Sequence, residues 1–93
     1  MKVIEYAGAF AGDKDAAAEL REKYVRPALV KGGTAVLDFS GVELATQSFI
    51  HALIAAIVRE SPSNLERIEF KECNDSIRSL VEIVVEYAQD EFE

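Results

Sequence analysis

The stretch from Thr34 to Arg59, TAVLDFSGVELATQSFIHALIAAIVR, constrains the fold of this chain more than any other. Its first part, Ala35–Phe39, is apolar except for Asp38, a pattern typical of an interior strand covered on both faces. A helix is predicted at Gln47–Glu60, with Thr46 as its N-cap. We expect this strand, turn and helix to be the unit on which the rest of the chain packs, with any functional site at the junction.

The remaining elements follow from hydrophobic alternation, helical periodicity and turn residues. They are a half-buried strand at Lys2–Tyr6, a helix at Lys14–Arg26 capped by Asp13, a kinked last turn at Pro27–Lys31, a half-exposed strand at Leu65–Lys71, and a long helix that is capped by Asn74 or Asp75 and runs to about Gln89, with a frayed end after it. Each connection between strands is long enough to hold a helix, which implies parallel strands. The sequence therefore predicts an α/β domain of order β-α-β-α-β-α, with the strand order left open.

Composition restricts the partners of this domain. A chain of 93 residues forms one domain, and its net charge of −7 disfavours nucleic acid and anionic membranes. One Cys and one His make neither an internal disulfide nor a set of metal ligands. We expect no cofactor and, because no targeting or membrane-spanning segment is evident, a cytoplasmic location.

The helix at Gln47–Glu60 has two unlike halves. Large apolar side chains cover one half: Phe49, Ile50, Leu53, Ile54, Ile57 and Val58. The other half has a low profile and consists of His51, Ala52, Ala55, Ala56 and Arg59. Two interpretations stay open: neighbouring helices crowd this side, or it is a contact face for a partner or for a second copy of the chain.

The residues Leu37-Asp38-Phe39-Ser40-Gly41-Val42, followed by Gln47-Ser48-Phe49 at the start of an apolar helix, resemble the STAS-like domain family of unknown function. That family is related to the STAS domains of bacterial anti-sigma-factor antagonists. The resemblance spans nearly the whole chain and implies a single STAS-like domain over residues 1–93. It also implies a non-enzymatic regulatory protein, with a histidine-kinase-like ATPase as its partner.

In the antagonists that this chain resembles, an Asp-Ser-Ser/Thr-Gly motif opens the helix, and its first Ser is phosphorylated by the partner. The corresponding residues here are Thr46, Gln47, Ser48 and Phe49. Because Gln47 has no hydroxyl group, the candidate acceptors are Ser48 and, less favourably, Thr46. Helix capping explains both residues without any phosphorylation. The resemblance also makes Gln47 part of the predicted partner-docking face, together with His51, Ala52, Ala55 and Arg59.

Other polar residues offer weaker sites. Asp38 is expected to accept hydrogen bonds from the Ser40-Gly41 turn, and the alternative is a small-ligand crevice at Asp38–Ser40. His51 lacks a nucleophile at a fixed spacing, so a contact with Glu43 or simple exposure is expected. Val42 and Leu44 are apolar anchors of the connection, and Cys73 is a half-buried filler.

Three functions remain open at this point. The first is a regulatory module that binds a protein partner through the helix starting at Gln47. The second is a ligand-binding or catalytic domain that uses the Asp38–Ser40 crevice. The third is a homo-oligomeric scaffold that pairs through the alanine face. The sequence has no glycine-rich phosphate loop, metal set or catalytic triad, and this favours the first function.

Overall fold

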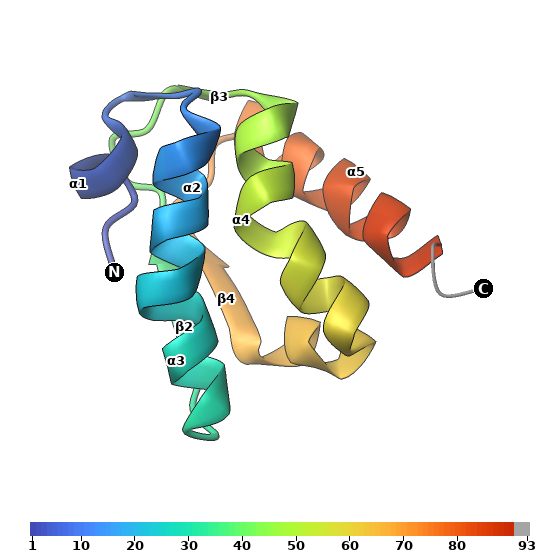
Figure 1. Cartoon of the computed structure of the whole chain (residues 1–93). Coiled ribbons are helices and arrows are strands. Elements are labelled where there is room, and N and C mark those ends of the chain that lie inside the picture. The colour runs from blue at the N-terminus through green and yellow to red at the C-terminus, as the bar shows by residue number, and fades with distance from the viewer. Residues whose placement is uncertain (91–93) are drawn as a thin grey trace.

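The computed structural model describes residues 1–90, in which short parallel sheets lie behind a layer of helices (Figure 1). In chain order the elements are α1 (Ile4–Ala7), β1 (Phe10–Ala11), α2 (Lys14–Leu20), the π-helical turn η1 (Arg21–Val25), α3 (Arg26–Val30), β2 (Ala35–Asp38), β3 (Leu44–Ala45), α4 (Gln47–Glu60), the 3-10 helix η2 (Pro62–Arg67), β4 (Ile68–Lys71) and α5 (Asp75–Asp90). The predicted α/β class is confirmed. Within residues 1–90, no helix is long and apolar enough to cross a membrane.

Strand β2 belongs to a two-stranded sheet, and the interior position expected from its apolar sequence is found only at Asp38. It pairs in parallel with β4, in a register that runs from Ala35 opposite Ile68 to Asp38 opposite Lys71. On its other edge, Lys2 forms a single parallel bridge with Asp38. The N-terminal bridge residue Lys2, β2 and β4 therefore lie side by side in sequence order. Both crossover connections, α2–α3 and α4, lie in front of the sheet in Figure 1.

This arrangement covers only one face of β2, so the expectation of cover on both faces is wrong. Leu37 and its neighbours on the helix-facing side are fully buried, whereas Val36 and Asp38 on the other side are half-buried. The backbone N–H of Val36 donates a hydrogen bond to the Tyr24 hydroxyl at 3.3 Å. On this edge of β2 the N-terminal segment pairs only at Asp38. A side chain of the helical layer therefore accepts the hydrogen bond of Val36 that a neighbouring strand would otherwise accept.

The strand expected at Lys2–Tyr6 is also wrong beyond its first residues. Val3 N–H donates to the Asp38 carbonyl at 2.9 Å, and Asp38 N–H donates to the Met1 carbonyl at 2.9 Å. The Val3 side chain is fully buried, and its carbonyl then accepts the hydrogen bonds that begin the helical turn α1. A run with high β propensity becomes helical here because it has a pairing partner at one position only.

The kink expected at Pro27 takes the form of a π turn just before the proline. The Arg26 N–H donates to the Arg21 carbonyl, five residues back, and Pro27 has no N–H to continue the pattern. The expected helix at Lys14–Arg26 is thereby divided into α2 and η1, and the expected last turn at Pro27–Lys31 corresponds to α3. Because an i→i+5 bond brings residues five apart together, Arg21 and Arg26 reach the same neighbour, α4.

The third expected strand is shorter than predicted, because Pro62–Arg67 forms the 3-10 helix η2 and only Ile68–Lys71 pairs with β2. A second parallel pair was not expected: β1 and β3 align Phe10 with Leu44. Asn74, rather than Asp75, caps α5, since its Oδ1 accepts from Ile77 N–H at 2.9 Å. Residues 91–93 of the expected frayed end lie outside the described residues.

Helix α4 lies at the centre of the hydrophobic core. Its predicted apolar half is buried in full: Phe49, Ile50, Leu53, Ile54, Ile57 and Val58 are each at most 1% exposed. The helix packs against α2 on one side and against α5 on the other, as Figure 1 shows. The predicted bounds and the Thr46 cap of α4 are confirmed.

Candidate functional site: the surface at the start of helix α4

The first turn of α4 is fixed by its cap and open to solvent. Thr46 has an extended backbone (φ −88°, ψ 157°), and its Oγ1 accepts from Phe49 N–H at 3.1 Å. The next two residues, Gln47 and Ser48, are exposed, and so is His51 one turn further on. Together with Lys14 of α2 and the half-buried Ala52, they line a shallow groove between the starts of the two helices.

The turn before this helix explains the role of Asp38. Its Oδ1 accepts from Ser40 N–H at 2.8 Å, as predicted from the sequence. Gly41 has φ 82°, a left-handed backbone conformation that favours glycine, and a Cβ at this position would also displace the terminal methyl group of Ile4, 2.9 Å away. The Asp38 carboxylate therefore shapes the turn that leads to α4.

The low-profile side of α4 is largely occupied by its own neighbours. The Arg59 guanidinium lies 3.1 Å from His51 Nε2, so its side chain extends two turns back along the helix. Ala55 lies between these two residues and is only 1% exposed. The Ala52 carbonyl accepts from Arg21 Nη1 at 2.7 Å. Ala55 is thus removed from the predicted docking face, and His51 contacts Arg59 in place of the suggested Glu43.

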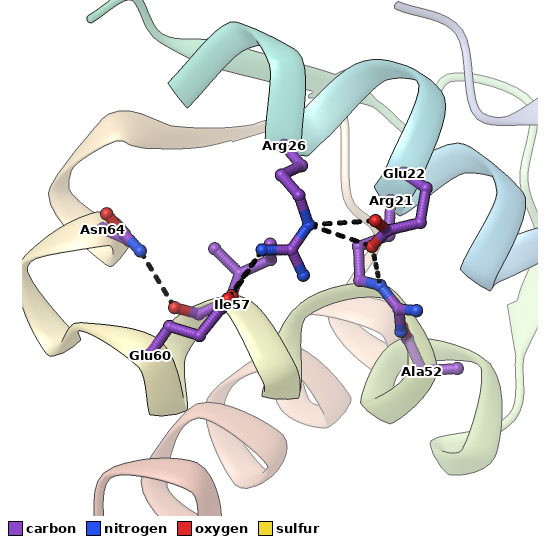
Figure 2. A network of polar contacts seen from close by, with 7 residues as sticks. All are labelled: Arg21, Glu22, Arg26, Ala52, Ile57, Glu60 and Asn64. Atoms are coloured by element: carbon purple, nitrogen blue, oxygen red, sulfur yellow. Dashed lines mark hydrogen bonds and ion pairs between the residues drawn. The ribbon is translucent and has the colours of Figure 1, made fainter. Parts of the chain in front are cut away.

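A charged network fastens the far half of α4 to the α2–α3 segment (Figure 2). Arg26 Nη1 donates to both carboxylate oxygens of Glu60 at 2.7 Å, and Arg26 Nε donates to Glu22 at 3.0 and 3.1 Å. The Arg21 Nε donates to the same Glu22 at 2.7 Å. The two arginines hold the pKa of Glu22 below its usual range, and Glu60 and Glu22 raise the pKa of Arg26. This end of α4 is therefore engaged in contacts within the fold. The part of α4 that is open to solvent is its first two turns.

Two apolar residues whose exposure was not predicted from the sequence lie beside that open part. Phe10 and Leu44 face each other across the β1–β3 pair and are 61% and 51% exposed. The Phe10 ring lies 3.1 Å from the position of a Cβ on Gly12, which itself would be 3.6 Å from the Thr46 methyl group. The ring is therefore close to the start of α4.

Val42 and Leu44 were predicted to be apolar anchors of the connection; Val42 (4% exposed) does anchor it, whereas Leu44 (51% exposed) does not. Because β1 and β3 are two residues long each, the alternation that would have revealed the exposed pair is too short to recognise in the sequence. We call the residues Phe10, Lys14, Leu44, Gln47, Ser48 and His51 the α4 entrance surface.

Cys73 is partly buried, as predicted, and burial raises the pKa of its thiol. A raised pKa lowers the fraction of reactive thiolate at neutral pH. In the described part of the chain, no group of three or more His, Cys, Asp or Glu residues is arranged to hold a metal ion.

The fold and this surface define a class: a small α/β domain with parallel strands, whose polar residues at the strand–helix junction serve as caps and turn formers. Comparison with known families then identifies the family of this chain. The model of the STAS-like domain family of unknown function matches residues 16–78, and the chain belongs to this family. No match was found among curated proteins or among solved structures. The match includes the α4 junction, whereas Phe10, Lys14 and all of α5 after its first turn lie outside it.

Proposed function

We propose that this protein is a bacterial regulatory module without enzymatic activity, which acts in the cytoplasm by binding a protein partner through the α4 entrance surface. The observation that carries this proposal is the exposed Phe10–Leu44 pair beside the open first turn of α4. Interfaces are built on such apolar centres surrounded by polar side chains, and here the polar rim is Gln47, Ser48 and His51.

The chemical alternatives have less support. The Asp38 carboxylate is engaged by its own turn, His51 contacts Arg59, and the pKa of Cys73 is raised. A catalytic site needs a nucleophile, an acid or base, and a geometry that joins them. The residues suggested by the sequence do not supply this set.

The proposed partner is a histidine-kinase-like ATPase, because the family to which the chain belongs is described as STAS-like. Ser48 is the proposed phosphate acceptor in such a partner switch. It is exposed in the first turn of α4, whereas the Thr46 hydroxyl is engaged as the cap. A phosphate on Ser48 would add up to about two negative charges next to Lys14 and the free amides of the helix start, which tolerate an anion. It would also change the charge of the docking surface.

Binding to histidine-kinase-like ATPases from the source genome tests the proposal. Each ATPase is incubated with the protein and ATP, and binding is measured by calorimetry and added phosphate by intact mass. We expect the double variant Phe10→Ser/Leu44→Ser to lose at least about tenfold in affinity, as for other central apolar contacts.

The matched control is Val30→Ser, since Val30 is also an exposed apolar residue (80%) but belongs to α3, at the other end of the molecule (Figure 1). Circular dichroism verifies that both variants fold. Equal affinities for wild type and the Phe10/Leu44 variant would refute the docking surface. Binding with no added mass, or phosphate that persists in Ser48→Ala, would refute the switch alone.

A further inference from the structure

The negative charge of this chain is concentrated at its C-terminal end. Residues 75–93 contain six acidic residues and one basic residue, whereas residues 1–74 contain eleven acidic and nine basic residues. The last part of the sequence thus supplies −5 of the net charge of −7. Most of it belongs to α5, which lies at the edge of the molecule in Figure 1.

Helix α5 also keeps apolar side chains exposed next to those that it buries. Its buried row packs the helix into the core: Ile77, Val81, Val84 and Ala88. A second row consists of Leu80, which is half-buried, Ile83 (44% exposed) and Tyr87 (65% exposed). Spacings of three and four residues place these three side chains on one face of the helix. We call them the α5 stripe.

Glu86 lies three residues after Ile83, and Glu82 lies four residues before Glu86, so these two exposed carboxylates form a row along the side of the stripe. An apolar row with an acidic border is complementary to a helix that carries apolar residues on one face and Lys or Arg beside them. We infer that the α5 stripe is a second docking surface, which binds a basic amphipathic helix of a protein partner. This inference goes beyond the proposed function, because it uses other residues, which belong to α5 and not to the α4 entrance surface.

Charge decides between the conceivable occupants of the stripe. A second copy of this chain would bring another strongly acidic helix against Glu82 and Glu86, and like charges at such short range oppose association. An anionic lipid surface is repelled for the same reason. A basic helix gains both the apolar contact with Ile83 and Tyr87 and the attraction of the acidic border.

A designed peptide of Leu and Lys, about five helical turns long and with Leu on one face, is a suitable probe. The controls are a scrambled peptide of the same composition and a Leu/Glu peptide with the same pattern. The full chain, labelled with nitrogen-15, is titrated with each peptide, and amide shifts are followed at about 50 and 200 mM salt. We expect shifts centred on Leu80–Tyr87 with the Leu/Lys helix only, and weaker binding at the higher salt concentration.

Variants separate the apolar contribution from the charge. Ile83→Ser/Tyr87→Ser should lower the affinity for the Leu/Lys helix at least about tenfold, and Glu82→Gln/Glu86→Gln about threefold. Glu5→Gln/Glu66→Gln removes the same net charge at exposed positions elsewhere and should leave the affinity unchanged.

Several results would overturn the inference. These are absence of binding, shifts spread evenly over the acidic surface, equal binding of the scrambled peptide, and full affinity in the folded Ile83/Tyr87 variant. Self-association of the wild type with shifts on α5 would assign the stripe to a second copy instead.

Discussion

Helices α4 and α5 are both amphipathic and pack against each other, but they have different relations to the rest of the molecule. Seven of the 14 residues of α4 are buried, and α2–α3 and α5 flank it on both sides. Helix α5 contacts α4 with one side and keeps Ile83 and Tyr87 exposed on another. The apolar residues of the two helices thus have different roles. Those of α4 stabilise the core, whereas those of the α5 stripe are exposed and can contact a partner.

The most direct way to test this contrast is to remove the same kind of side chain from both helices. Leu53 in α4 is 0% exposed, so Leu53→Ala removes buried contacts and leaves a cavity. We expect a loss of about 2–5 kcal/mol in the free energy of unfolding, measured by urea denaturation. Ile83→Ala, at a position that is 44% exposed, should change it by less than about 0.5 kcal/mol. Similar losses for the two variants would show that α5 is packed as tightly as α4.

The caps of the two helices also differ, and this gives the next largest effect. Asn74 connects α5 to the segment before β3, since Nδ2 donates to the Glu43 carbonyl at 2.8 Å while Oδ1 accepts from Ile77 N–H. Asn74→Ala loses both bonds and should cost about 1–2 kcal/mol in thermal or urea unfolding, whereas Asn74→Asp keeps the cap and should cost less.

Thr46 makes one capping hydrogen bond, to Phe49 N–H, so Thr46→Ala should cost about 1 kcal/mol and Thr46→Ser only a small part of that. Equal stability of Thr46→Ala and the wild type would mean that the cap does not fix the start of α4. The fixed position of the entrance surface would then need another explanation.

The sequence predicted α4 better than any other element, for reasons that are local. Its cap, its periodicity and the Pro62 that follows it all lie within or next to the helix. The resemblance to the STAS-like family was carried by the same region and is confirmed. The features that the sequence did not predict depend on distant residues. Phe10 and Leu44 are brought together only by a two-residue pairing of segments far apart in the chain.

The N-terminal segment illustrates the same limit. Its β propensity was real, but a strand needs a neighbour along its length, and only Lys2 finds one, opposite Asp38. Likewise, Ala55 was predicted on the surface because its own helix position allowed it. It is only 1% exposed and lies between His51 and Arg59, whose side chains contact each other, which helical periodicity alone does not indicate.

Ion pairs connect the α2–α3 segment to α4 at Glu60, whereas on the other side of α4 buried apolar residues pack against α5. On the α2–α3 side, hydrogen bonds from Arg21 and then Arg26 lower the pKa of Glu22. A carboxyl group whose pKa is lower in the folded state stabilises the fold above its unfolded pKa of about 4.5, and this contribution is lost as the pH falls through the folded value. Since the Glu22 side chain is 48% exposed, we expect less than about 1 kcal/mol.

Glu22→Gln should therefore flatten the dependence of unfolding free energy on pH below about 4.5, and high salt should reduce the difference from the wild type. Glu82→Gln on α5 is the matched control, an exposed helical glutamate on the apolar side of α4. If both variants had the same pH dependence as the wild type, the network around Arg26 would contribute nothing measurable. The contact between α4 and the α2–α3 segment would then depend on its other interactions, among them the hydrogen bond from Arg21 to the Ala52 carbonyl.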